Sequence, residues 1–173
     1  MTDAPTSFKD RLRLDEAEGA WWDQGRRYML IRPDALMGLF LNLPAERRAE
    51  AFEALARSIT RQGADSARAY RAMGGAGPGL LDIVAATAPQ LGWGRWTFSL
   101  EPDLLRLTVS NSPFAAGYGA SDAPVCHPIR GMMTAVGEMV LDRPVTVVET
   151  ACAAMGAPDC RFEARPAGGP GAD

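Results

Sequence analysis

Three cysteines and one glutamate place the strongest constraint on the fold of this chain, because their spacing can tie separate segments together. The stretch "VETACAAMGAPDCRFEA" holds Glu149, Cys152 and Cys160. The remaining cysteine, Cys126, lies upstream beside the single histidine of the chain. Between the last two cysteines, a glycine and a proline indicate a reversing turn between two strands, which would bring both thiols together beside the carboxylate.

From these residues alone, three interpretations stay open. Three thiolates and a carboxylate could make a four-coordinate tetrahedral zinc site, since thiolates select zinc over calcium or magnesium. Cys152 and Cys160 could instead form a disulfide, or all three cysteines could be small buried side chains of the core. The usual paired C-x-x-C knuckles are absent, and an odd number of cysteines leaves one thiol unpaired in any disulfide scheme.

Composition narrows the setting in which these groups work. The chain has 173 residues, 47% of them hydrophobic, and a net charge of −3. No basic block is present to hold a phosphate backbone, so we expect no binding to nucleic acid. No apolar run reaches about 18 residues and the N-terminus is charged, so we expect no membrane span, no signal peptide and a cytoplasmic location. Disulfides are uncommon there, which weighs against that interpretation.

The first half of the chain reads as mainly helical. Apolar residues at helical spacing predict one long amphipathic helix over residues 45–73, although Gly63 inside it allows an end there and a second helix after it. The other expected elements are an N-terminal polar extension (1–24) with room for an amphipathic helix, a strand (26–33), a helix begun by Pro33 and ended by Pro44, a plain turn (74–79) and a helix (80–92).

The second half reads as a sheet with one helix. Alternating side chains on either side of a Glu-Pro-Asp turn predict a hairpin over residues 94–113, and a Gly/Ser/Ala-rich loop follows over 111–125. A core-facing helix (127–141), two strands (144–152 and 160–166) and a disordered tail (167–173) complete the chain. Helices followed by antiparallel strands predict a single α+β domain over residues 25–166.

The order of the metal-binding candidates resembles the 4-vinyl reductase domain family. That pattern has a cysteine before a glycine-containing helix, a strand ending in E-x-x-C, and a second cysteine before an aromatic strand. Here it runs from Cys126 through "HPIRGMMTAVGEMVLDRPVTVV" to Glu149, and through Cys152 to Cys160. The resemblance implies that these four residues bind zinc. A site closed by four protein ligands is structural rather than catalytic. Arg130 and Arg161 are candidates to offset its excess negative charge.

The resemblance also implies a fold related to trafficking-complex (TRAPP) subunits, with helices packed on an antiparallel sheet, an apolar ligand pocket and a homodimer. Methionine and aromatic side chains suit a large flat ligand. The candidate lining residues are Trp93, Trp96, Phe98, Phe114, Tyr118, His127, Met132 and Met133. His127 is next to Cys126, so we expect it at a helix start or near ligand rather than on the metal.

Among family members, the stretch "RYMLIRPDALMGLF" is most similar to those of bacteriochlorophyll synthesis. The implied function is binding of a vinyl-bearing tetrapyrrole, as a carrier working with a pathway enzyme or as a nominal 4-vinyl reductase. We favour binding, because the sequence holds no dinucleotide fingerprint or iron–sulfur cysteine set. Two alternatives stay open. One is a sensor of small aromatic compounds that acts through a separate partner, and the other is an interaction scaffold.

Overall fold

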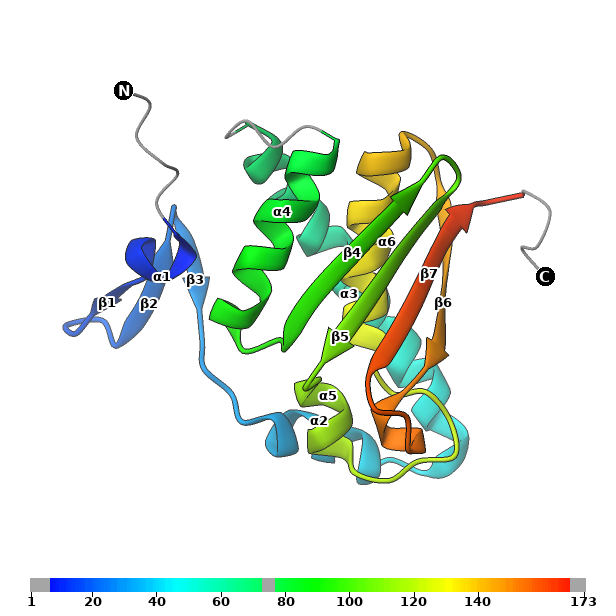
Figure 1. The fold of residues 1–173 in the computed structure, drawn as a ribbon. Coiled ribbons are helices and arrows are strands. Elements are labelled where there is room, and N and C mark those ends of the chain that lie inside the picture. The colour runs from blue at the N-terminus through cyan, green and yellow to red at the C-terminus, as the bar shows by residue number, and fades with distance from the viewer. Residues whose placement is uncertain (1–6, 73–76, 169–173) are drawn as a thin grey trace.

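The computed structural model describes residues 7–72 and 77–168, which form two antiparallel sheets and a set of helices (Figure 1). The N-terminal elements are α1 (Phe8–Arg11), β1 (Arg13–Asp15), β2 (Ala20–Asp23) and β3 (Arg26–Tyr28). Four helical elements follow: α2 (Pro33–Leu41), α3 (Ala45–Ala72), α4 (Pro78–Thr87) and the 3-10 helix η1 (Ala88–Leu91). The remaining elements are β4 (Arg95–Glu101), β5 (Leu104–Ser110), α5 (Pro113–Tyr118), α6 (His127–Leu141), β6 (Val145–Ala151), the 3-10 helix η2 (Ala153–Met155) and β7 (Cys160–Pro166).

The main sheet has the strand order β4-β5-β7-β6, with every neighbouring pair antiparallel. Helices α3, α4 and α6 lie on one side of it (Figure 1). The sequence explains this one-sided packing, because β5 alternates buried Leu105, Leu107 and Val109 with the more exposed side chains between them. The α+β fold and the hairpin predicted from the sequence are therefore confirmed.

A close crossing of α3 and α6 holds the helical layer together. Gly131 allows it, since a Cβ atom at this position would lie 2.4 Å from the main-chain oxygen of Ala56. The Thr60 hydroxyl lies 3.0 Å from both the Ala56 and the Gly131 carbonyl oxygens and can donate to either. The long helix runs unbroken through Gly63, so the alternative of two separate helices is wrong.

The N-terminal segment corrects one prediction. Only α1 is helical there, and residues 13–28 form a small sheet in the order β1-β2-β3. Its second turn joins Asp23 to Arg26 through Gln24 and Gly25, whose φ angles are 50° and 77°. Two successive positive φ values define the tight hairpin turn that matches strand twist. The strand expected over 26–33 ends at Tyr28.

Two further differences concern irregular segments. The loop expected over 111–125 contains α5, which is capped by the Ser112 hydroxyl accepting the Ala115 N–H at 3.4 Å. The turn predicted at 74–79 falls largely on residues 73–76, and the tail predicted at 167–173 largely on 169–173, outside the described residues. Within the described ranges, no helix combines the length and apolar character needed to cross a bilayer.

Candidate metal centre and ligand cavity

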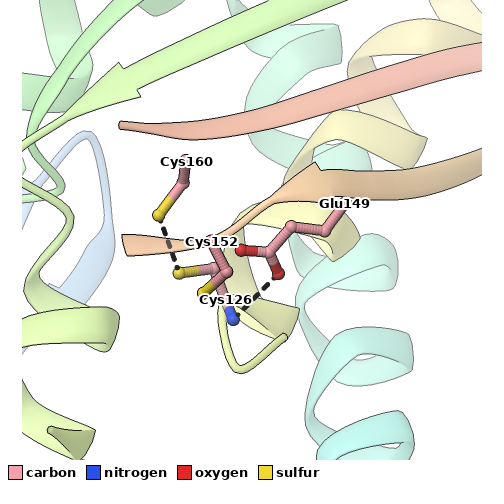
Figure 2. A group of neighbouring side chains, drawn as sticks. All are labelled: Cys126, Glu149, Cys152 and Cys160. Atoms are coloured by element: carbon pink, nitrogen blue, oxygen red, sulfur yellow. Dashed lines mark hydrogen bonds between the residues drawn. The ribbon is translucent and has the colours of Figure 1, made fainter. Parts of the chain in front are cut away.

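The four candidate metal ligands meet where α6 begins and where β6 and β7 are joined (Figure 2). Cys126 immediately precedes α6, Glu149 lies on β6, and Cys152 follows that strand. Cys160 is the first residue of β7. One potential ligand atom from each of the four lies within 4.8 Å of all the others. The spacing of the sequence therefore predicted a real cluster.

A β-bulge explains how the E-x-x-C spacing works. Residues three apart on a regular strand point to opposite faces of the sheet. The pairing of β6 with β7 shifts between Glu149 and Ala151, so that Glu149 is opposite Phe162 and Ala151 opposite Arg161. The extra residue re-aims the chain. As a result, Glu149 and Cys152 reach the same centre.

Distances within the centre suit a tetrahedral ion bound by sulfur. The Sγ atoms of Cys126 and Cys160 are 3.5 Å apart. A Zn–S bond of about 2.3 Å in tetrahedral geometry implies about 3.8 Å between sulfurs. All three cysteines are free thiols and buried, so the disulfide interpretation is wrong. Oε1 of Glu149 is also buried and has no hydrogen-bond partner among the described residues, which is the position a cation would satisfy.

The metal-free centre cannot ionise fully. Burial, with a hydrogen bond to Cys152, raises the pKa of Glu149 to about 8. Hydrogen bonds to the other two thiols, together with burial, raise the pKa of Cys126. The hydrogen bond from Cys126 lowers the pKa of Cys160. One proton is thus shared within a crowded acidic cluster, and a bound cation is what would allow all four groups to become ligands.

Main-chain groups support the centre. The N–H of Cys126 donates to Glu149 Oε2 at 3.1 Å, and the N–H of Ala153 donates to Cys160 Sγ at 3.3 Å. The Ser112 hydroxyl lies 3.2 Å from Cys126 Sγ. These donors do what we expected of two arginines.

The expected arginine partners lie elsewhere. Arg130 instead pairs with Glu53 at 2.5 Å and contacts His127 Nδ1 at 3.1 Å. Arg161 is exposed on β7.

His127 belongs to neither the metal cluster nor the cavity described below. Its ring stacks on Phe52 at 4.6 Å, and burial lowers its pKa. Tyr118 also packs against Phe52, at 5.8 Å, and Met133 is fully buried in the core. These three residues therefore do not line the cavity, because the sequence marks them as apolar or aromatic without telling cavity wall from core.

A cavity of about 400 Å³ lies between the N-terminal sheet and the helices, away from the metal centre. Four of the predicted lining residues border it: Trp93, Trp96, Phe114 and Met132. Trp93 meets the Phe114 ring edge-on at 5.1 Å, while Phe98 packs against Trp96 outside the lining. The structure thus brings together half of the predicted lining set.

The N-terminal segment supplies a wall that the sequence did not predict. Phe8, Leu12, Trp21 and Tyr28 border the cavity, and Met29–Ile31 continues the wall from β3 toward α2. An ion pair between Arg11 and the buried Asp23, at 3.0 Å, holds this segment in shape. The pair Trp21–Trp22 in an otherwise polar stretch was the available signal.

Residues 105–166 match the model of the 4-vinyl reductase domain family. This matched segment runs from β5 to the end of β7 and contains all four residues of the metal centre. It confirms the family resemblance predicted from their spacing. Over 64 residues the chain is 39% identical to the Bacteriochlorophyll synthase 23 kDa chain of Cereibacter sphaeroides. The match covers 37% of this chain and 31% of that relative, so the chain spans about a third of the relative's length.

Solved structures share the fold beyond this matched segment. The phenol-responsive sensory domain of the transcription activator PoxR superposes with a TM-score of 0.74 at 22% identity, over 90% of this chain and 85% of that one. A trafficking protein particle complex subunit 3 from Naegleria fowleri has a TM-score of 0.55 at 12% identity, over 77% and 93% of the two chains. Both likenesses concern the fold, and they confirm the predicted relation to trafficking subunits.

Proposed function

We propose that this chain is a zinc-stabilised domain that binds a hydrophobic small molecule in the cavity between its N-terminal sheet and its helices. The observation that carries the proposal is the cavity itself, which is apolar, faced by aromatic rings, and within the range of about 300–1,000 Å³ typical of ligand sites. A packed core would leave no space of this size.

The metal we propose for the Cys126 centre is zinc. Three sulfur donors and one carboxylate match its preference, and four protein ligands leave no open coordination position for water or substrate. When bound, zinc would supply structural cross-linking and no step of a reaction. The ligand site and the metal site are therefore separate.

For the ligand we propose a vinyl-bearing tetrapyrrole of bacteriochlorophyll synthesis, held and delivered to a pathway enzyme. The relative named as a bacteriochlorophyll synthase chain supports this context. A carrier role fits better than catalysis, because no Asp, Glu, Lys, Arg or His is among the described residues that line the cavity. General acid–base chemistry needs such a group.

A second candidate is a sensor of small aromatic compounds. The cavity volume, near the lower end of the range for ligand sites, favours a ligand of one to three rings. A complete tetrapyrrole would enter by one edge, with the rest of the macrocycle outside against the exposed side chains of Met29 and Leu30. The two candidates thus predict different occupants of one site.

A titration distinguishes them. Zinc-loaded protein is titrated with a protochlorophyllide-type pigment and with phenol while tryptophan fluorescence is followed. Saturable quenching should weaken in Trp93→Phe, whose ring faces the cavity, and persist in Trp22→Phe, whose ring does not line it. Pigment binding supports the carrier and phenol binding supports the sensor. If neither compound binds, the proposed function is wrong.

We also propose that the domain forms a homodimer. Helix α2 is apolar on all sides, with Met37 and Phe40 buried and Leu39 and Leu41 exposed. A helix of this kind is usually covered. Light scattering coupled to gel filtration would measure the mass directly, and a monomer at micromolar concentration would contradict the proposal.

A further inference from the structure

The walls of the cavity carry no charge. Aromatic and aliphatic side chains dominate, and the polar side chains among the described lining residues are Gln62, Thr87, Gln90, the indoles and the Tyr28 phenol. Moving an isolated charge into such surroundings is costly unless an opposite charge or several hydrogen bonds meet it. A ligand that fills this cavity must therefore be uncharged at the end that enters.

Most polar groups in the walls are already occupied. The Thr87 hydroxyl donates to a main-chain carbonyl one turn back at 2.8 Å. The Gln90 amide donates to another carbonyl at 2.9 Å and accepts the Lys9 N–H at 2.7 Å. The indole of Trp96 donates to the Trp93 carbonyl at 3.0 Å. These bonds fix the walls in place and leave little capacity for a ligand.

Gln62 differs from its neighbours. It lies on α3 at the rim of the cavity, is exposed, and makes no side-chain hydrogen bond to any described residue. An amide can donate and accept at once. The indoles of Trp21 and Trp93, which are also without a hydrogen bond to the described part of the chain, can only donate. Gln62 is thus placed to match a group that does both.

We infer that the cavity selects an uncharged aromatic ligand and that Gln62 determines its specificity by hydrogen-bonding a hydroxyl or carbonyl group on the ligand. The inference rests on the proposed function of the cavity as a ligand site. It also constrains the tetrapyrrole candidate, because the carboxylate side chain of such a pigment would stay outside while a neutral edge enters. Gln62 would then meet a polar atom of that edge.

Three probes of the same shape test this inference on zinc-loaded protein at pH 7: 2-naphthol, naphthalene and 2-naphthoate. Wild-type protein should bind 2-naphthol more tightly than naphthalene and bind the anion most weakly. Gln62→Leu should lower affinity for 2-naphthol by about 3- to 10-fold, the effect of one hydrogen bond, and leave naphthalene unchanged or tighter. Glu50→Leu, an exposed change on the same helix outside the cavity, is the control and should alter neither affinity.

The outcomes separate the inference from its foundation. If naphthalene itself fails to bind, the cavity is no ligand site, and the proposed function is wrong together with the inference. If naphthalene binds but 2-naphthoate binds as well as 2-naphthol, or Gln62→Leu leaves 2-naphthol affinity unchanged, then the inference alone is wrong. Circular dichroism of Gln62→Leu should match wild type, since the side chain supports no described contact.

Discussion

Replacing Gly131 by alanine should destabilise the protein, although the same change inside an open helix is stabilising. A helical Gly→Ala change ordinarily contributes about 1 kcal/mol in favour of folding. Here the new methyl would lie 2.4 Å from the Ala56 carbonyl oxygen and 3.1 Å from the adjacent main-chain carbons. Because these are backbone atoms, no side chain can turn aside, and helices α3 and α6 must separate.

The expected size follows from three effects. Overpacking of a tight contact costs about 1–3 kcal/mol. Separating the helices also weakens the Thr60 hydrogen bond to the Gly131 carbonyl, which contributes about 1 kcal/mol. After the helix-propensity gain, the free energy of unfolding should fall by about 1–3 kcal/mol, which corresponds to a Tm lower by about 3–9 °C.

Urea denaturation at constant excess zinc measures this change, with Gly38→Ala as the matched control. Gly38 is also helical, but no heavy atom lies within 4 Å of a Cβ built there. The control should therefore be more stable than wild type by about 0.5–1 kcal/mol. If Gly131→Ala were stabilised to the same degree, the close α3–α6 crossing described above would be refuted.

Two further changes address the metal and the cavity mouth. Cys152→Ser should lose about one bound zinc per chain by elemental analysis and lower the free energy of unfolding by more than about 4 kcal/mol, a size expected when a structural metal is lost; a variant that keeps its metal would contradict the assigned ligand set. Leu30→Ser should change stability by less than about 0.5 kcal/mol, because the side chain is 79% exposed. It should nevertheless weaken pigment binding about tenfold if the ligand covers it. Val148→Thr, on an exposed strand position outside the cavity, should leave pigment affinity unaltered, and equal affinities for all three proteins would show that residues 29–31 do not contact the ligand.

Long periodic elements could be predicted from the sequence because their pattern repeats several times. The helices over 45–72 and 127–141 each present an apolar face over several turns, and β5 alternates along its whole length. Short elements lack that repetition. Helix α5 has six residues, so only its local signals, Ser112 as cap and Pro113 in the first turn, could have revealed it.

The metal centre could be predicted more fully than the cavity for a related reason. Cysteine is rare in this chain, so three of them beside one acid stand out from the sequence alone. Aromatic and methionine side chains serve core and cavity alike. Nothing in the letters tells Met133, which is fully buried, from Met132, which borders the cavity one residue earlier. The N-terminal wall was missed because it depends on contacts between residues far apart in the chain.

Helix α6 connects the two sites physically. Cys126 precedes its first turn, and Met132 borders the cavity six residues later, about 9 Å along the helix axis. Cys126 makes no side-chain cap to the helix, since its thiol belongs to the metal centre. Metal binding therefore fixes where α6 begins, and Gly131 fixes its distance from α3, which carries Gln62. A zinc ion that never touches the ligand would still set the separation between two walls of the ligand cavity.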